Sequence, residues 1–294
     1  MILVTGATGT IGSEVFRRLA AAGEAPRALV RDPQLARDRL GEAVEHVVGD
    51  LDQPETLEAA LAGVERVFLL TRQSNRQPQQ ERNVIDAAVR SGARHLVKLS
   101  VFRADDRSLL QIARQHRDTE RAIERSGLTY TLVRPVFLMQ NLPSMVRRGA
   151  IRTAAGDGRV AMVDARDVAA VSVAALTSRR SDGTTYTLTG PRPLSLDEVA
   201  ATLSRQTGKR IRHERVAPDN VRDALQRSGV EAWFASDMAK LQSMLATGYE
   251  DLVTDDVRTA TGTSPSTLAE FARDFADHFT RGTGAGEAPG RSAA

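Results

Sequence analysis

The segment best suited to chemistry is the run of glycines near the N-terminus, in the sequence VTGATGTIG. Gly6, Gly9 and Gly12 directly follow an apolar run and directly precede an amphipathic one. The first glycine permits a tight turn, the second lets the backbone approach a pyrophosphate, and the third lets a helix pack closely on a sheet. The spacing therefore predicts a dinucleotide-binding loop, although a loop of this shape that binds nothing is the alternative. Further backbone contacts are expected from Thr8, Thr10 and Ile11.

The end of the second apolar run, in PRALVRDP, bears on the choice of dinucleotide. An acidic residue at this place usually holds the ribose 2′-OH of NAD, whereas an arginine accommodates the 2′-phosphate of NADP. Arg31 can pair with a phosphate through two parallel hydrogen bonds. Asp32 beside it favours the other cofactor. We expect NADP(H) to be preferred over NAD(H).

Other candidate cofactor contacts follow the next three apolar runs, because ligands of open α/β sheets bind at the carboxyl ends of the strands. Asp50 suits a side chain beside the adenine, with Leu51 contributing its backbone, but Asp50 could equally cap the following helix. Residues expected beside the ribose and nicotinamide are Thr71, Gln73, Ser100 and Val101.

A proton-transfer group is expected in the helical stretch IARQHRDTERAIER. A Tyr with a Lys four residues later transfers protons well, because the ammonium lowers the pKa of the phenol. The residues four positions after the three tyrosines are instead Arg134, Gly190 and Val253.

His116 is the best candidate to replace that pair, since an imidazole donates a hydrogen bond or a proton near neutral pH. Its alternative role is structural, bonded to the cofactor ribose or to a backbone carbonyl. Glu120 is expected to be a surface charge rather than a partner that orients His116, and Lys98 is expected to face the edge of the sheet.

A substrate wall is expected after the sixth apolar run, in RPVFLMQN. Phe137 and Met139 could stack on a flat ring, and Gln140 or Asn141 could donate a hydrogen bond to a carbonyl oxygen. Trp233, next to a second aromatic residue, could also cover a flat ligand. For each aromatic or Met side chain, packing in the core is the competing interpretation. Asp167 is expected to cap a helix.

Six apolar runs alternate with helical segments, which predicts βαβ units and a parallel sheet. The expected strands cover residues 2–5, 27–30, 46–48, 67–70, 96–100 and 130–133. We therefore expect an α/β fold with a Rossmann-type, doubly wound parallel sheet over residues 1–150. A smaller α/β region over 151–280, sharing some elements with the first, should form the substrate cleft. The Gly, Ala and Pro content of 281–294 indicates a disordered tail.

Composition excludes several classes of protein. The chain contains no cysteine, which excludes disulfides, thiolate metal sites and thiol catalysis. Its net charge is +3 and its basic clusters are short, so no nucleic-acid surface is expected. No apolar run is long enough for a membrane span, no secretory signal is visible and no metal site is expected, so we expect a cytoplasmic protein. The oligomeric state is open, with a homodimer among the options.

Several segments together carry a family resemblance: GATGTIG, QQERNVIDAAVRSGARHLVKLS, HRDTERAIERSGLTYTLVRPVFLMQN, GDGRVAMVDARDVAA and YTLTGPRPLSLDEVA. Over about residues 1–275 the chain resembles the NmrA-like branch of atypical short-chain dehydrogenases/reductases. Within that branch it looks most like the type-2 NAD(P)H:quinone oxidoreductases, in which a His followed by Thr-Glu also replaces the tyrosine-bearing segment. The resemblance implies a Rossmann domain that holds NADPH and a smaller domain that forms a cleft beside the nicotinamide.

Three functions follow from these observations. The first is an NADPH-dependent oxidoreductase that reduces quinones or related conjugated aromatic ketones by direct hydride transfer. A quinone accepts hydride readily and its reduced anion is weakly basic, so a strong proton donor is not essential. The second is an NADP(H)-sensing regulatory protein without turnover, and the third is a tailoring enzyme that reduces or couples aromatic polyketides. His116 and the 137–141 segment favour catalysis, because a sensor needs neither.

Overall fold

The computed structural model describes residues 1–280, so the tail expected over 281–294 lies outside them. Seven parallel strands form the main sheet in the order β10-β6-β5-β4-β1-β2-β3. This order confirms the Rossmann-type, doubly wound sheet. The strands are β1 (Ile2–Val4), β2 (Pro26–Val30), β3 (His46–Val48), β4 (Arg66–Leu69), β5 (His95–Leu99), β6 (Thr129–Pro135) and β10 (Thr185–Leu188).

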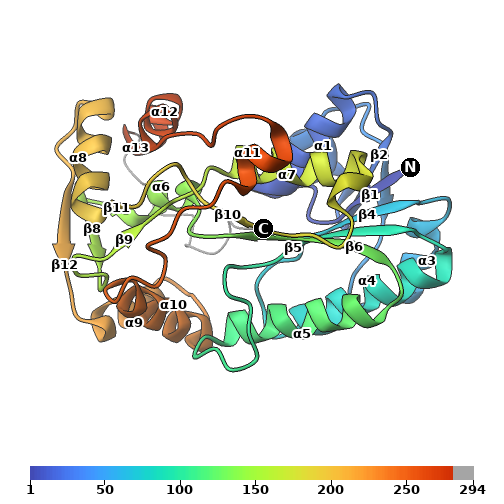
Figure 1. Ribbon diagram of the computed structural model, residues 1–294, viewed down its shortest axis with the longest axis horizontal. Coiled ribbons are helices and arrows are strands. Elements are labelled where there is room, and N and C mark those ends of the chain that lie inside the picture. The colour runs from blue at the N-terminus through green and yellow to red at the C-terminus, as the bar shows by residue number, and fades with distance from the viewer. Residues whose placement is uncertain (281–294) are drawn as a thin grey trace.

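Helices cover both faces of this sheet (Figure 1). One face packs against α1 (Thr10–Ala21), α2 (Pro33–Leu40), α7 (Ala165–Thr177) and α11 (Asp256–Thr261), and the other packs against α3 (Glu55–Leu61), α4 (Gln77–Ser91) and α5 (Gln111–Arg125). The predicted apolar face of α1, with Ile11, Val15 and Leu19, is buried. The apolar residues Val84, Ile85 and Ala88 of α4 are also buried, whereas Val89, which shares their spacing, is 44% exposed.

A smaller region with its own apolar core lies at one end of the sheet. Its strands are β7 (Val146–Arg147), β8 (Ala150–Thr153), β9 (Arg159–Val160), β11 (Leu194–Ser195) and β12 (Arg212–Arg215). Its helical segments are η1 (Met139–Asn141), α6 (Leu142–Met145), α8 (Leu196–Thr207), α9 (Pro218–Arg227), α10 (Ala232–Leu245), α12 (Leu268–Asp274) and α13 (Ala276–Thr280), and a further turn, η2 (Arg179–Ser181), precedes β10.

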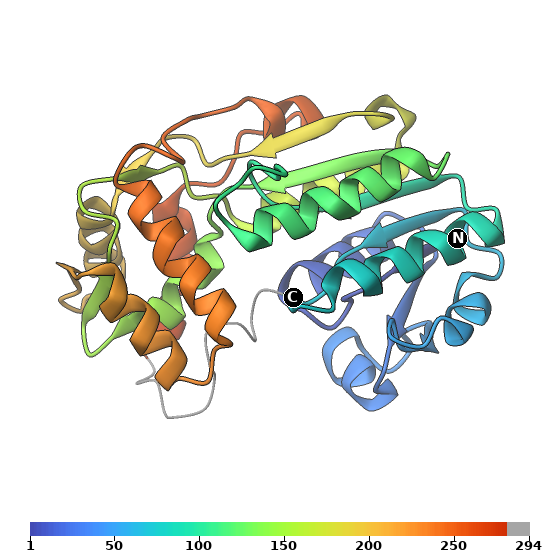
Figure 2. The same ribbon diagram turned by 90° about the horizontal axis from the view of Figure 1, so that it is seen from below.

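The two regions share elements, because α7 and β10 follow residue 150 in the chain and yet pack in or on the main sheet. The division at residue 150 stays a prediction. A contact between the regions forms where Asp237 of α10 accepts a hydrogen bond from Ile112 N at the start of α5 (2.8 Å), and Figure 2 shows these helices near each other.

Two observations limit what the described residues can do. No helix among residues 1–280 is long and apolar enough to cross a bilayer. The same residues contain no group of three or more His, Asp or Glu side chains that could hold a metal ion.

Candidate active site

The glycine loop joins β1 to α1, as the spacing predicted. Gly6 has a φ of +62°, which a side chain would strain. A Cβ on Gly12 would lie 2.1 Å from Gly6 O, so only glycine lets the helix sit this close to the loop. Gly9 is the N-cap of α1 and no side chain caps that end, which leaves N–H groups of the first turn available to an anion. These residues therefore fit a pyrophosphate, with Thr8 and Thr10 half-buried beside it and Ile11 anchored in the core.

Arg31 and Asp32 have different environments at the end of β2. Asp32 is the N-cap of α2, and its carboxylate accepts hydrogen bonds from Gln34 N (2.8 Å) and Leu35 N (3.3 Å). Arg31 is exposed and pairs with no carboxylate among residues 1–280. The acidic group is therefore occupied, whereas the guanidinium is available.

Asp50 does not cap the following helix, so that reading is wrong. The N-cap of α3 is Pro54, and Asp50 Oδ1 accepts from Asp52 N (3.0 Å) in the turn after β3. Leu51 O accepts from Asn83 Nδ2 (2.7 Å), which ties this turn to α4. Both residues lie at the carboxyl edge, half-buried.

A buried ion pair lies beside the residues that follow β4. Lys98 Nζ lies 2.6 Å from Glu81 Oε1, and both side chains are fully buried. The expectation that Lys98 faces the edge of the sheet is therefore wrong, and its ammonium also donates to Leu99 O (2.6 Å). Thr71 Oγ1 donates to the same Glu81 oxygen (2.7 Å), so its hydroxyl points toward the ion pair of Lys98 and Glu81.

His116 is linked to this ion pair through two glutamines. Its Nε2 lies 3.0 Å from Gln73 Nε2 and 3.2 Å from Gln77 Nε2. Gln77 Nε2 also donates to Glu81 Oε1 (3.2 Å). Because a carboxylate only accepts, Gln77 must turn its NH₂ group toward Glu81, and that group then donates to His116 Nε2 as well. The proton of the imidazole therefore belongs on Nδ1.

The environment of His116 keeps the imidazole neutral. Burial, aided by the positive charges of Lys98 and Arg134, lowers its pKa well below its ordinary value. The lowered pKa argues against the expectation that His116 gives a proton near neutral pH, and the role of His116 stays a prediction; donation of a hydrogen bond is compatible with the neutral ring. Several buried polar atoms of this cluster have no hydrogen-bond partner among the described residues: Gln73 Oε1, Gln77 Oε1 and His116 Nδ1.

Glu120 is fully buried, so the expectation of a surface charge is also wrong. It accepts from Ser100 Oγ (2.6 Å) and from Arg134 Nε (2.8 Å), and Arg134 contacts its second oxygen too. Arg117 adds a longer contact to Glu120 (3.2 Å). These contacts fix the end of β5, where Val101 follows half-buried, and they leave Glu120 occupied rather than directed at His116.

The side chains of the segment after β6 differ in how deeply they are buried. Met139 is 1% exposed and packs in the core of the smaller region, so it cannot stack on a ligand as it stands. Phe137 is half-buried against the same core. Asn141 is half-buried, and no hydrogen bond engages its side-chain amide within the described part of the chain. It is the residue of this segment best able to bind a carbonyl oxygen.

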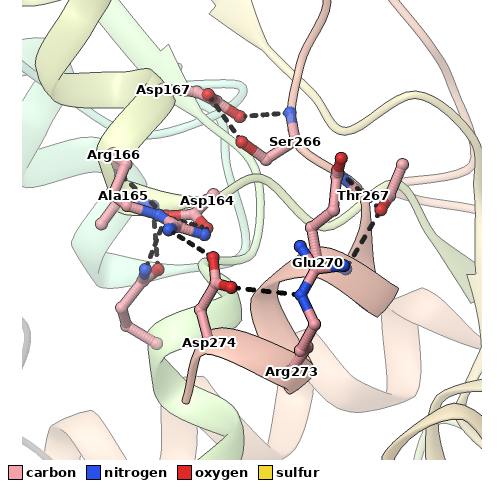
Figure 3. A network of polar contacts seen from close by, with 10 residues as sticks. Asp164, Ala165, Arg166, Asp167, Ser266, Thr267, Glu270, Arg273 and Asp274 are labelled. Carbon is pink, nitrogen blue, oxygen red and sulfur yellow. Dashed lines mark hydrogen bonds and ion pairs between the residues drawn. The ribbon is translucent and has the colours of Figure 1, made fainter. Parts of the chain in front are cut away.

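Gln140 has a structural role instead of the expected substrate contact. Its amide donates to Asp164 Oδ1 (2.8 Å) and accepts from Ala165 N (2.8 Å), at the start of α7. Asp164, not Asp167, is the N-cap of α7. Asp167 accepts from the backbone N and hydroxyl of Ser266 (2.7 and 3.0 Å), as Figure 3 shows. This network joins α7 to the segment before α12.

Trp233 is half-buried on α10, tilted against Phe234, and its indole N–H donates to Glu231 (2.7 Å). It is not among the side chains that pack, within residues 1–280, against the apolar core that Phe137 joins. Its role as a substrate residue stays a prediction.

Sequence reasoning missed a group of residues that meets Phe137. Glu250 is 4% exposed, and its Oε2 accepts from Phe137 N (3.3 Å). Next to it, Tyr249 lies edge-on to Phe102 with ring centroids 5.7 Å apart. The guanidinium of Arg103 lies 4.6 Å from the Tyr249 ring and 5.0 Å from the Phe102 ring. No motif marks these residues, and only their aromatic and acidic character could have drawn attention to them.

Comparison with known proteins places the chain in a family. The model of the NmrA-like family matches residues 1–272. An NAD(P)H azoreductase of Xenophilus azovorans is 38% identical over 95% of this chain and 99% of its own length. A (4-alkanoyl-5-oxo-2,5-dihydrofuran-3-yl)methyl phosphate reductase of Streptomyces griseus subsp. griseus is 39% identical over 95% and 99% of the two chains.

Solved structures agree with this assignment. An NADPH-dependent quinone oxidoreductase of Escherichia coli, solved in complex with NADPH, superposes with a TM-score of 0.84 at 28% identity, over 94% of this chain and 99% of that one. The protein therefore belongs to the NmrA-like family.

Proposed function

We propose that this NAD(P)H-dependent oxidoreductase uses NADPH to reduce quinones or related conjugated aromatic ketones. The observation that carries the proposal is the absence of a Tyr-x-x-x-Lys pair, in a chain that also buries His116 near the positive charges of Lys98 and Arg134, which lower the pKa of its imidazole. An acceptor reduced here cannot depend on a phenol activated by lysine or on an imidazolium. Quinones meet this condition, because the oxyanion produced by hydride addition is weakly basic.

The cofactor supplies the hydride, and the protein's residues bind and orient the reactants. The glycine loop and the first turn of α1 would hold the pyrophosphate. Arg31 would bind the 2′-phosphate, a preference supported by the engagement of Asp32 in the cap of α2. His116, with its proton on Nδ1, can donate one hydrogen bond without changing its charge. The ribose and the acceptor are the two candidate receivers of this hydrogen bond.

The acceptor would lie at the carboxyl ends of β5 and β6. Phe102, Phe137 and Tyr249 give this place aromatic walls, and Asn141 offers an amide to a carbonyl oxygen. The azoreductase and the quinone oxidoreductase among the similar proteins are named for conjugated acceptors, which supports a flat substrate here.

The test is NADPH oxidation across a panel of benzoquinones, naphthoquinones and anthraquinones, with NADPH binding followed by fluorescence in the same samples. We expect turnover that depends on the number of fused rings. NADPH binding without turnover of any acceptor would refute the reductase and favour a sensor of NADP(H). Turnover confined to ketones outside the panel would instead favour a tailoring enzyme.

A further inference from the structure

Reduction by hydride leaves an oxyanion on the acceptor, and a proton must reach it. Burial beside the charges of Lys98 and Arg134 lowers the pKa of His116 well below its ordinary value, so it is a poor acid source. Lys98 is committed to Glu81, and Glu120 to Arg134 and Ser100. The groups nearest to the predicted nicotinamide site are therefore already engaged.

Glu250 lies in the turn that follows α10. Its carboxyl oxygen Oε2 accepts from Phe137 N (3.3 Å), and its own backbone oxygen accepts from Ala161 N (3.4 Å). Phe137 is the second residue after β6, so Glu250 is fixed at the carboxyl end of that strand. Ligands of open α/β sheets bind at this edge.

Burial, rather than the groups that face it, favours the neutral form of Glu250. Arg103, from the segment after β5, is the cation that acts on it, but no ion pair forms between them in the described chain. The Arg103 guanidinium is instead held against the rings of Tyr249 and Phe102. The remaining polar contact is the single N–H of Phe137, and the neighbouring Tyr249 carries no charge near neutral pH. Burial outweighs these contacts and raises the pKa of Glu250 to about 7.

A carboxyl group that titrates near the working pH is well matched to proton donation, since it is both protonated and acidic enough to transfer. Strongly perturbed acids in a cleft are also typical of functional sites. Glu250 combines this property with a hydrogen bond from Phe137 N just after β6, and its chain neighbour Tyr249 packs against Phe102.

We propose that Glu250 is the proton donor to the acceptor, a role that rests on the proposed reductase function. The C4–H bond of the bound dihydronicotinamide breaks, and its hydrogen and electron pair form a C–H bond on the conjugated acceptor. The acceptor is reduced by two electrons, NADPH is oxidised to NADP⁺, and the carbonyl oxygen becomes an oxyanion. The O–H bond of Glu250 then breaks and its proton bonds that oxygen, after which solvent returns a proton to the carboxylate.

The proposal predicts a dependence on the basicity of the product. An enolate from a simple enone is much more basic than a hydroquinone anion, so it needs the acid more. Two acceptors separate these cases: menadione, a quinone, and 4-phenyl-3-buten-2-one, a conjugated aromatic ketone.

The experiment compares the wild type with Glu250→Gln, and Glu42→Gln on the exposed surface serves as the matched control. With the ketone we expect Glu250→Gln to lower kcat roughly 100-fold or more, while kcat with menadione falls far less. The wild-type rate with the ketone should decline as pH rises through about 7, and this decline should vanish in the variant. NADPH affinity, measured by fluorescence, should stay unchanged.

A readout independent of turnover is the infrared carbonyl band of a protonated carboxyl in the NADPH-bound protein. It should disappear as pH rises through about 7, and it should be missing from Glu250→Gln. Equal losses of kcat with both acceptors, or an unchanged pH profile, would overturn the proton-donor role alone. A wild type that binds NADPH but turns over neither acceptor would overturn the reductase function and the donor role with it.

Discussion

The burial of Glu250 has a consequence for stability that can be measured without any substrate. Burial raises the pKa of its carboxyl from an ordinary 4.5 to about 7 in the folded protein, whereas the unfolded chain titrates near the ordinary value. Between these two values the folded state binds more protons than the unfolded state. The stabilisation that belongs to the protonated form is therefore lost as pH rises through this window.

The size of the effect follows from the two pKa values. Between pH 5 and pH 8 the linkage relation gives a loss of roughly 2–3 kcal/mol in the free energy of unfolding, because a carboxylate must then be kept in a buried position. Glutamine at position 250 carries no charge at either pH. The difference in stability between Glu250→Gln and the wild type should therefore shift by roughly 2–3 kcal/mol in favour of the variant from pH 5 to pH 8.

Urea denaturation of both proteins at the two pH values measures this shift, and the subtraction cancels every other titrating group. Glu42→Gln, on the exposed surface, should show no comparable shift. A difference between Glu250→Gln and the wild type that is constant with pH would refute the reasoning, since it would mean that the carboxyl titrates near its ordinary value despite its burial.

Three further perturbations test the site. Glu81→Gln leaves the fully buried Lys98 ammonium without its counter-charge, so it should lower the free energy of unfolding by about 3–5 kcal/mol, as measured by thermal denaturation. Glu81→Leu combined with Lys98→Met should recover most of this lost stability. A double variant that is no more stable than Glu81→Gln would contradict the reasoning. Arg31→Ala should weaken NADPH binding roughly tenfold and leave the affinity for NADH unchanged, and Arg39→Ala, at another exposed arginine, serves as the control. Equal losses of affinity for both cofactors would argue against a contact between Arg31 and the 2′-phosphate. Gly12→Ala places a Cβ 2.1 Å from a backbone oxygen of the loop, so it should abolish NADPH fluorescence enhancement, and normal affinity would be inconsistent with the loop's role.

The main features of the fold could be predicted from the sequence because they depend on short-range patterns. Strands of a parallel sheet buried on both faces appear as apolar runs, and the helices between them show a periodic apolar face. The glycine loop could be located for the same reason, since its three glycines lie within seven residues. The predicted strand ends differ from the observed ones by a residue or two. For example, Thr5 and Ser100 were expected to end their strands, but each is the first residue after its strand.

The polar part of the site could not be predicted because its partners are far apart in the chain. Glu120 is neutralised by Arg134 on the next strand, and Lys98 by Glu81 on the preceding helix. One signal was available for Lys98: a lysine in the middle of a strand covered on both faces must be buried, and a buried ammonium requires a counter-charge. No comparable signal marked Glu250, whose position depends on the fold of the smaller region.

The polar network separates two tasks that a Tyr-x-x-x-Lys pair combines. A lysine in that pair holds the cofactor ribose and also makes the phenol acidic, so the proton source lies next to the cofactor. Here the only lysine close to His116 is neutralised by Glu81 within the described residues, and the chain of hydrogen bonds through Gln77 keeps the imidazole neutral and oriented. A neutral imidazole suits binding, because it does not compete for protons as the pH changes. In the proposed reaction the acid is Glu250, whose carboxyl is fixed at the carboxyl end of β6, and an acceptor whose anion is weakly basic would be reduced even when proton transfer from this acid is slow.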